Sequence, residues 1–277
     1  MGVIGPNGAG KSTLARLLCG QLKPTSGSIL IDGKPLPAFR ERRHIVGLVP
    51  QNIGLYPHLS GTENLEVFAK LFRLPRSERV AAIDRSLRLV EMTPRAHVRV
   101  EEMSGGMQRR INVAVATLMS PPVIVFDEPT AGVDQPARDV IHHLAKRLSE
   151  QGHVVCLVTH ELEHAERLCD SIVLLEKGRL HAFGTPSEIL DRAFGTRHEV
   201  LLRLRSAPTA DIHGKLDALG FTQLDAAPTA YSAQSTDGNP NFVARLMQAL
   251  GDGRHRVREV TVRRPGLDVL MSGMSSQ

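Results

Sequence analysis

The apolar residues of the first 195 positions follow two alternating patterns. Short continuous apolar runs predict buried strands, as in a parallel sheet that is covered on both faces. Apolar residues three or four positions apart predict helices, chiefly from Thr62 to about Leu118 and from Val140 to Leu148. The alternation of the two patterns is typical of α/β proteins. The expected strands lie at residues 3–4, 28–31, 44–49, 123–126, 154–158, 172–175 and 179–183.

The pattern changes after about residue 195, where polar positions become more frequent and the predicted elements shorter. Their β-α-β-α-β order predicts a small C-terminal α+β appendage. We therefore expect one domain over residues 1–195 and an accessory domain over residues 196–277. The strands expected in the accessory domain lie at 200–204, 227–235 and 257–262, and its helices at 212–219 and 242–250.

The composition is that of a soluble globular protein. Its 277 residues suffice for one large and one smaller domain, and they are 42% hydrophobic and 23% charged. No apolar run approaches the roughly 20 residues that a membrane span requires. Cys19, Cys156 and Cys169 lack the spacing of metal ligands, so we expect reduced thiols of a cytosolic protein rather than disulfide partners.

The formal net charge of +5 raises the question of whether the chain binds an anionic membrane, an acidic protein or nucleic acid. Positive residues gather at positions 40–43, 73–110 and 254–264. Such clusters are either solvated faces or surfaces attracted to an anionic membrane or an acidic partner, and the sequence leaves both interpretations open. Nucleic acid is not expected, because two Tyr and no Trp provide few platforms for base stacking.

The most specific chemical signal is the phosphate-loop pattern G-x-x-x-x-G-K-[ST] near the start of the chain. Its glycines let backbone N–H groups approach a densely anionic triphosphate, and Lys11 can reach the β- and γ-phosphates. Ser12 can ligate Mg²⁺, and the helix that begins here adds the positive end of its dipole. The motif predicts that a nucleoside triphosphate and Mg²⁺ are bound by Gly5, Pro6, Asn7, Gly8, Ala9, Gly10, Lys11, Ser12 and Thr13.

Two adjacent carboxylates follow the apolar run at residues 123–126. Ligands of open α/β sheets bind at the carboxyl ends of the strands, where these two acids are expected. Asp127 would hold Mg²⁺, and Glu128 would act as the general base that polarises the attacking water. Together with the phosphate loop, the acid pair predicts nucleotide hydrolysis.

Four further features occur in a fixed order along the chain. Gln51 follows a predicted strand, where its amide could reach Mg²⁺ or the attacking water. Ser104 is placed as the N-cap of a helix whose first residues, Gly105 and Gly106, expose backbone N–H groups and so form a second anion site. Asp134 follows the acid pair, and His160 ends a predicted strand, where its imidazole could contact the γ-phosphate.

This ordered set resembles the nucleotide-binding subunits of ATP-binding-cassette (ABC) transporters, and the resemblance covers residues 2 to about 195. It implies a RecA-like P-loop NTPase core with an inserted helical subdomain at about residues 55–118. By this resemblance, residues 5–13 are Walker A, Asp127 is Walker B, Glu128 is the catalytic glutamate, Gln51 is the Q-loop residue, Ser104-Gly105-Gly106 is the signature, Asp134 is the D-loop residue and His160 is the switch histidine.

The resemblance also implies an activity, a ligand set and partners. The chain would be an ATPase subunit at the cytoplasmic face of the membrane that powers a separate permease chain. Two ATP-binding subunits, identical or different, would pair head to tail, with each ATP between one Walker A and the opposite signature. Catalysis would involve Glu128, His160, Gln51 and Lys11; ATP would also contact Ser104, Gly105, Gly106 and Asp134; and Mg²⁺ would be held by Ser12, Gln51 and Asp127.

The direction of transport is suggested by three segments, at residues 49–65, 131–134 and 264–270. They are similar to the bacterial branch that exports drugs, polysaccharides or lipids, so an exporter is expected. Two alternatives are a soluble ABC ATPase that acts on ribosomes or DNA and a regulator that has lost catalysis. A single cassette without a long coiled-coil insertion disfavours the first alternative, and the complete set of catalytic residues disfavours the second.

Two features depart from the family pattern. Met103 replaces Leu, which conserves volume, and Met107 replaces Gln, which removes an amide near the ribose or the partner subunit. Family members also carry strands before Walker A, with an aromatic residue that stacks on adenine. We therefore expect a truncated N-terminal sheet and a Met1 that is an internal start or the edge of a fragment. The alternative is a short protein with impaired selectivity for adenine.

Overall fold

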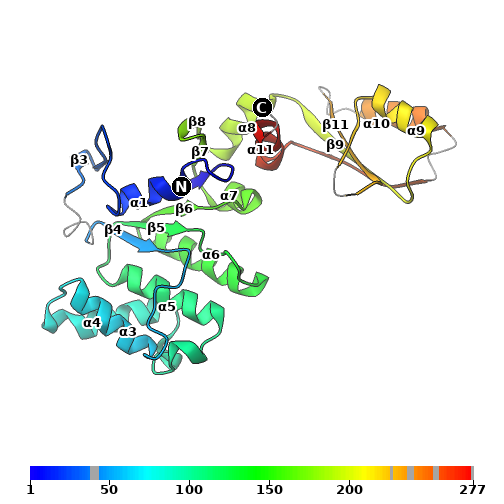
Figure 1. Cartoon of the computed structure of the whole chain (residues 1–277). Coiled ribbons are helices and arrows are strands. Elements are labelled where there is room, and N and C mark those ends of the chain that lie inside the picture. The colour runs from blue at the N-terminus through cyan, green and yellow to red at the C-terminus, as the bar shows by residue number, and fades with distance from the viewer. Residues whose placement is uncertain (38–43, 225–226, 236–239, 252–255, 276–277) are drawn as a thin grey trace. The chain divides into compact units, whose positions relative to one another are not determined.

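The computed structural model describes residues 1–37, 44–224, 227–235, 240–251 and 256–275, and it divides into two compact units, Met1–Thr185 and Pro186–Gln277 (Figure 1). The predicted basic cluster at residues 40–43 lies outside the described residues, as do positions 254 and 255 of the cluster at 254–264. The first unit ends before residue 195, so helix α8 (Pro186–Phe194) belongs to the second unit.

The first unit is built on a sheet of six strands in the order β4-β5-β6-β1-β7-β8. All neighbouring pairs are parallel except β7 and β8, which form a hairpin. The hairpin turns at Lys177 and Gly178, whose φ angles of 47° and 78° are both positive, as a tight type I′ turn requires. The strands are β1 (Gly2–Ile4), β4 (Val46–Val49), β5 (Val123–Asp127), β6 (Val154–Val158), β7 (Ile172–Glu176) and β8 (Arg179–Gly184).

The short strand β1 lies at the centre of this sheet, between β6 and β7. All three of its residues are buried, as expected for a strand that is covered on both faces. On one face, Val3 packs in a core cluster with Ala15 of α1 (Lys11–Leu18) and Val125 of β5. Helix α6 (Gln135–Glu150) also contacts the sheet, at β6, and α7 (Leu162–Leu168) contacts β1. The predicted phosphate loop at residues 5–13 thus follows directly from a buried central strand.

A helical segment is inserted between β4 and β5 (Figure 1). Its first helix begins with a capping box, in which the Ser60 hydroxyl accepts a bond from the Glu63 N–H and the Glu63 carboxylate accepts one from the Ser60 N–H. The insertion comprises α3 (Gly61–Leu71), α4 (Arg76–Leu89), the 3₁₀ turns η1 (Thr93–Arg95) and η2 (Val100–Glu102), and α5 (Gly105–Thr117).

The strand expected at residues 28–31 is shorter than predicted. Only β2 (Leu30–Ile31) forms, in a two-stranded ribbon with β3 (Lys34–Pro35). The turn between them places Asp32 and Gly33 at φ 51° and 73°, so it favours the Asp-Gly pair found there. Leu30 is 56% exposed, and an exposed ribbon of this length has little core to extend it.

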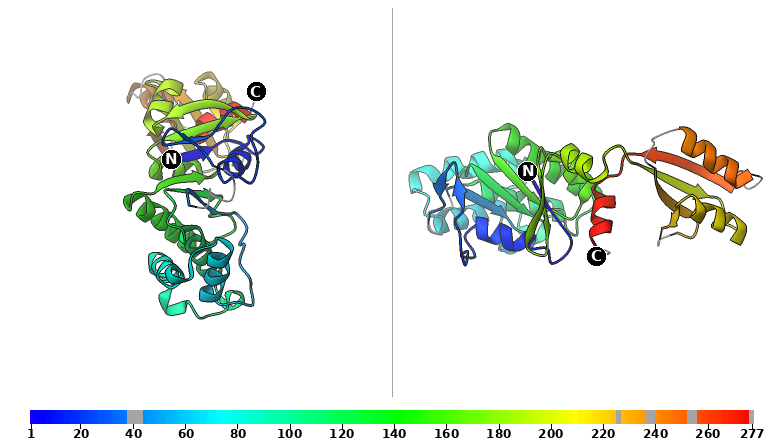
Figure 2. Two further views of the ribbon diagram at one scale, coloured as in Figure 1. Left: turned by 90° about the vertical axis from the view of Figure 1, so that its left-hand side faces the viewer. Right: turned by 90° about the horizontal axis from the view of Figure 1, so that it is seen from above.

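The second unit contains an antiparallel sheet in the order β10-β11-β9-β12 (Figure 2). Chain order is β-α-β-β-α-β, the ferredoxin-like arrangement, and α9 and α10 share one core cluster with the strands. The prediction missed β10, because two exposed residues carry no periodic pattern. The elements after α8 are β9 (His198–Leu204), α9 (Ala210–Ala218), β10 (Thr222–Gln223), β11 (Ala230–Ser235), α10 (Pro240–Leu250), β12 (Val257–Arg263) and α11 (Leu267–Ser275).

Across the described residues of both units, no helix combines the length and the apolar character that a bilayer-spanning segment needs.

Candidate nucleotide-binding site

The phosphate loop connects the buried strand β1 to helix α1. A Cβ atom at Gly5 would lie 2.3 Å from the carbonyl oxygen of Leu175, so only glycine fits where the loop leaves the sheet. Gly10 is the N-cap of α1 and has a φ of 98°, a left-handed conformation that glycine adopts without strain. The first N–H groups of α1 therefore face the loop, as an anion site at a helix N-terminus requires.

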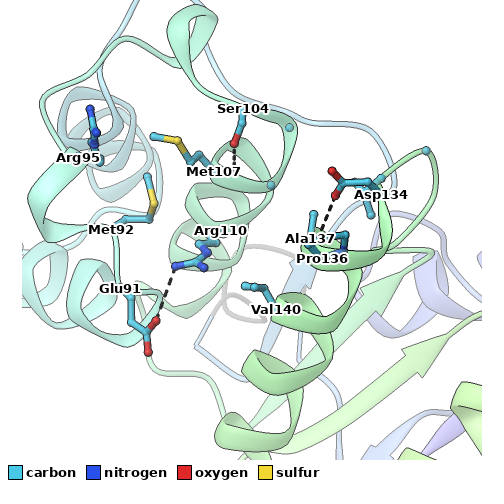
Figure 3. Close-up of a pocket in the computed structure, with 14 residues that line it drawn as sticks. Glu91, Met92, Arg95, Ser104, Met107, Arg110, Asp134, Pro136, Ala137 and Val140 are labelled. Carbon is cyan, nitrogen blue, oxygen red and sulfur yellow. Dashed lines mark hydrogen bonds and ion pairs between the residues drawn. The ribbon is translucent and has the colours of Figure 1, made fainter.

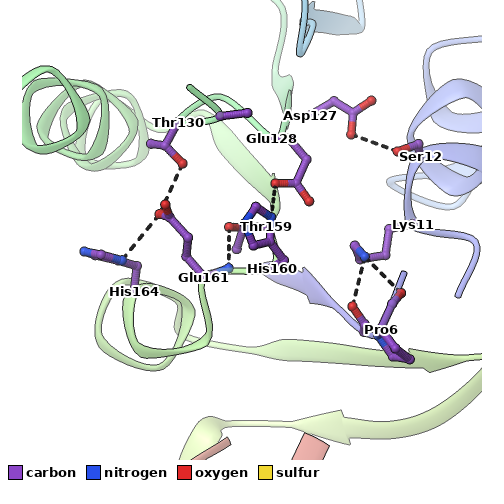
Figure 4. Close-up of polar contacts among 12 residues, drawn as sticks. Pro6, Lys11, Ser12, Asp127, Glu128, Thr130, Thr159, His160, Glu161 and His164 are labelled. Carbon is purple, nitrogen blue, oxygen red and sulfur yellow. Dashed lines mark hydrogen bonds and ion pairs between the residues drawn. The ribbon is translucent and has the colours of Figure 1, made fainter. Parts of the chain in front are cut away.

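Lys11 is buried beneath this loop, with only 7% of its surface exposed. Its Nζ donates hydrogen bonds to the carbonyl oxygens of Gly5 (2.9 Å) and Pro6 (3.1 Å) (Figure 4). An ammonium group has three N–H donors, so these two contacts leave one donor for a phosphate oxygen. The loop thus orients the Lys11 charge through its own backbone.

The two predicted acids occur where β5 ends. The Asp127 carboxylate accepts a bond from the Ser12 hydroxyl at 3.3 Å, which joins the phosphate loop to β5. Glu128 is 9% exposed and has a positive φ of 48°, a conformation that is uncommon for a residue with a side chain. The N–H of Glu128 is bound by the carbonyl of Val158, so the backbone there is held by the neighbouring strand.

His160 meets Glu128 directly (Figure 4). Its Nδ1 lies 2.6 Å from Oε2 of Glu128, and with an ionised carboxylate the Nδ1–H is the donor. His160 follows β6, which neighbours β5 in the sheet, so parallel pairing brings the two side chains together. The Glu128 carboxylate therefore has a hydrogen-bond partner that can orient it, as a general base requires.

A pocket of about 430 Å³ brings these segments together. It receives residues from the phosphate loop, from the loop after β4, from the end of β5 and from the end of β6. Three predicted residues, Gly5, Pro6 and Asp127, do not line the pocket but contact residues that do. The carbonyls of Gly5 and Pro6 accept hydrogen bonds from Lys11, and the Asp127 carboxylate accepts one from Ser12. The pocket, hereafter the phosphate-loop pocket, is lined by Asn7, Gly8, Ala9, Gly10, Lys11, Ser12, Thr13, Gln51, Glu128 and His160.

The remaining predicted residues line a different pocket, of about 720 Å³, hereafter the Ser104 pocket (Figure 3). Ser104 caps α5, and its hydroxyl accepts a bond from the Met107 N–H at 3.3 Å. Asp134 caps α6, and its carboxylate accepts a bond from the Ala137 N–H at 3.0 Å. Gly105 and Gly106 line the same pocket. No residue lines both pockets, so a single chain holds the predicted nucleotide contacts as two separate halves.

The two methionines that depart from the family pattern occupy different environments. Met103 is 6% exposed and belongs to the core. Met107 lines the Ser104 pocket beside Met92 and Arg110, and Arg110 forms an ion pair with Glu91 at 3.7 Å (Figure 3). Met103 therefore has a packing position, and Met107 is the substitution that faces the pocket.

Sequence analysis missed a buried cation, Arg109, which is 5% exposed. Its guanidinium donates to the carbonyl oxygens of Pro50 (3.0 Å) and Ala131 (3.3 Å). Burial lowers the pKa of Arg109 from its ordinary value. Arg109 lies three and four positions before Asn112 and Val113 on α5, which are 3% and 1% exposed, and a charged residue on this buried face is the signal that could have identified it. It was missed because its partners lie in two loops far away along the chain.

Comparison with known proteins identifies the family. The protein-family model "ABC transporter" matches residues 1–131. A solved ATP-binding subunit of an ABC transporter is 32% identical, with a TM-score of 0.60, and the match covers 70% of this chain and 81% of that one. The chain belongs to the ABC transporter family. The predicted family and the P-loop NTPase fold are confirmed.

Two further proteins are similar to this ABC chain. The Nod factor export ATP-binding protein I of Cupriavidus metallidurans is 39% identical over 195 residues, which are 70% of this chain and 64% of that protein. The chain thus spans less than two thirds of the length of this curated relative. The ATP-binding cassette MJ0796, solved as a dimer in a post-hydrolysis state with ADP and Pi, is 30% identical with a TM-score of 0.57, and the match covers 66% of this chain and 84% of that one.

Proposed function

We propose that this chain binds ATP with Mg²⁺, hydrolyses it, and thereby powers a separate membrane permease of an exporter. The observation that carries the proposal is the phosphate-loop pocket, where Lys11, Gln51, Glu128 and His160 converge from four segments. Membership of the ABC transporter family supports ATP as the nucleotide. Similarity to a Nod factor export ATP-binding protein supports export as the direction, and the cargo is left open.

The triphosphate would be bound by groups that are already oriented. The N–H groups at the start of α1 and the third N–H of Lys11 present positive charge to the same pocket. Both sources of charge are held by backbone contacts before the nucleotide arrives, so little reorganisation is needed on binding.

The donor set beside the loop fits Mg²⁺, which prefers hard oxygen ligands. The Ser12 hydroxyl and the Asp127 carboxylate lie 3.3 Å apart, and the Gln51 amide lines the same pocket as Ser12. These three side chains would hold the ion. When bound, Mg²⁺ neutralises charge that develops on the phosphates.

Hydrolysis would depend on Glu128 as the base that orients and deprotonates the attacking water. The hydrogen bond from His160 limits the directions in which the Glu128 carboxylate can point. Glu128 lies in the pocket at the end of a buried strand, so its backbone is rigid where the reaction needs accurate placement.

The separation of the two pockets supports a dimer as the working unit. ATP bound in the phosphate-loop pocket of one chain would be completed by the Ser104 pocket of a second chain. Phosphate charge is neutralised best when donors approach it from both sides, so ATP would hold the dimer closed and hydrolysis would release it. A dimer that alternates between these two states can drive a conformational change in a permease at the cytoplasmic face of the membrane.

The test is Mg²⁺-dependent phosphate release from ATP by the purified chain and by Glu128→Gln. Loss of the base should lower kcat about 10²- to 10⁴-fold while ATP binding is retained. Because ATP then persists, gel filtration in ATP should show a dimer for Glu128→Gln. The matched control is Glu150→Gln, because the Glu150 carboxylate is exposed on α6. This variant should hydrolyse ATP like the wild type.

The proposal is wrong if the folded wild-type chain neither binds nor hydrolyses ATP. It is also wrong in its catalytic part if Glu128→Gln retains wild-type kcat, because another group would then activate the water.

A further inference from the structure

The side chain of Glu161, next to His160, lies where four other side chains converge (Figure 4 shows two of them). Thr130, after the acid pair, donates its hydroxyl to Oε2 at 3.1 Å. From α6, the Arg138 guanidinium lies 3.2 Å from Oε1 and the His142 Nε2 lies 3.9 Å from Oε2. From α7, the Nδ1 of His164 lies 3.4 Å from Oε2. Both carboxylate oxygens therefore have partners, Oε1 on α6 and Oε2 on the loop after β5, on α6 and on α7.

The Glu161 carboxylate and its partner Thr130 are largely buried. The Glu161 side chain is 14% exposed, and the Thr130 residue is 3% exposed. A carboxylate buried to this extent needs hydrogen-bonding or charged partners, and the four side chains around Glu161 provide them. Glu161 is also the N-cap of α7, yet its side chain makes no capping bond. The carboxylate thus does not cap its own helix and instead contacts the side chains of Thr130, Arg138, His142 and His164.

Two side-chain bridges connect the same pair of loops. Glu128 and Thr130 belong to the loop after β5, and His160 and Glu161 belong to the loop after β6. The first bridge joins Glu128 to His160 at 2.6 Å, and the second joins Thr130 to Glu161 at 3.1 Å. In the second bridge Thr130 is 3% exposed and the Glu161 side chain is 14% exposed, whereas the His160 side chain of the first bridge is 61% exposed. The second bridge thus holds the residue next to His160 at a more buried point.

The same carboxylate also reaches the helix that begins after Asp134. Arg138 and His142 lie four positions apart on α6 and so share one face of that helix. Asp134, at the start of α6, lines the Ser104 pocket. A shift of α6 would therefore pull on Glu161, and through Glu161 on the segment that carries His160.

We propose that Glu161 is a positioning residue that holds His160 against Glu128 and links this contact to the helix after Asp134. The inference rests on the proposed function, in which Glu128 is the base. Glu161 does not line the phosphate-loop pocket, so it acts through His160, which does.

Four variants of the full-length chain test this inference. Glu161→Gln removes the charge and keeps the shape, Glu161→Asp keeps the charge, and Glu163→Gln is the control, because Glu163 is exposed on the same helix. We expect Glu161→Gln to lower kcat about 10- to 100-fold, as displacement of a reacting group does, with little change in KM. Glu161→Asp should recover part of this loss, and Glu163→Gln should behave as the wild type.

The fourth variant, His160→Ala, separates positioning from a general loss of structure. If Glu161 acts through His160, then Glu161→Gln should have little further effect on kcat when it is added to His160→Ala. A merely structural role would instead lower the activity of both backgrounds by the same factor. Equal factors in the two backgrounds overturn the proposal.

A measurement without ATP tests the positioning role of Glu161 independently of the proposed function. The His160 ring signals in an NMR spectrum of the nucleotide-free chain, assigned by their absence in His160→Ala, report the contact with Glu128. They should shift in Glu161→Gln and stay unchanged in Glu163→Gln. If the wild type hydrolyses no ATP but these signals shift, the proposed function fails and the positioning role stands. If the signals are identical in Glu161→Gln and wild type, the positioning role fails.

Discussion

At the scale of single residues, Arg109 connects three segments that the site needs. It projects from α5 and donates to the carbonyls of Pro50, before Gln51, and of Ala131, after the acid pair. Arg109→Met removes both bonds, and we expect it to lower the free energy of unfolding by about 1–3 kcal/mol. It should also lower kcat, because the loop that carries Gln51 loses its attachment. Urea unfolding and the ATPase assay measure the two effects.

Two comparisons decide whether Arg109 acts by geometry or by charge. Arg109→Lys keeps the charge, but a single ammonium cannot span two carbonyls as the guanidinium does, so only part of the stability should return. Arg88→Met is the control, because Arg88 is 64% exposed and pairs with Asp84 on the same helix. Full stability in Arg109→Lys would show that the bridge between the two loops is unimportant.

The residues of the site divide into those that a motif predicts and those that only the fold reveals. Lys11, Ser12, Glu128 and His160 were predicted because their chemistry requires fixed positions relative to the phosphate loop and the strand ends. The partners of Arg109 lie 59 and 22 residues away, and the bond between Thr130 and Glu161 spans 31 residues. No local pattern encodes such contacts, because they depend on which loops the sheet order brings together.

At the scale of elements, the packing of α6 on α7 predicts a dependence of stability on pH. His142 of α6 is 7% exposed, and its ring centroid lies 4.6 Å from that of His164. Burial, and next the charge of His164, lower the pKa of His142 from its ordinary value of 6.5, although Glu161 and Asp139 favour the charged form and Arg138 opposes it. The fold therefore prefers neutral His142.

The sign of the effect follows from this lowered pKa. The stability from neutral His142 is fully present above the unfolded pKa of 6.5, and it is lost as the pH falls through the folded pKa. Urea unfolding between pH 7.5 and pH 5.5 should show a falling free energy of unfolding, with at most about 1.4 kcal/mol per pH unit from this proton. His142→Gln should reduce the slope, and the exposed His97→Gln should not. An unchanged slope in His142→Gln would contradict the assignment.

The elements that sequence analysis predicted best are the buried ones. The apolar runs at residues 123–126 and 154–158 became β5 and β6, because a strand covered on both faces must be apolar throughout. The two-residue strands β2 and β10 are mostly exposed, so their pairing is decided by turns and neighbours rather than by burial. Helix α8 was not predicted, and only Ile189 of its residues is buried.

At the scale of the whole molecule, the separation of the phosphate-loop pocket from the Ser104 pocket predicts complementation between chains. Lys11→Ala should disable the first pocket, and Ser104→Arg should block the second with a bulky cation. Each variant alone should have background ATPase activity, because every site in a head-to-tail dimer would contain one defect. A dimer of one chain of each kind would contain one intact site and one site with both defects.

Mixing the two variants in equal amounts should therefore restore activity without any intact chain. Random pairing makes about half of the dimers mixed, and each mixed dimer has one of two sites intact, so turnover should reach about a quarter of the wild-type value. The control is a mixture of Lys11→Ala with the double variant Lys11→Ala/Ser104→Arg, in which no site can be intact and activity should stay at background. If Ser104→Arg alone hydrolyses ATP like the wild type, or if folded partners fail to complement while still forming dimers, the two pockets do not act on the same nucleotide.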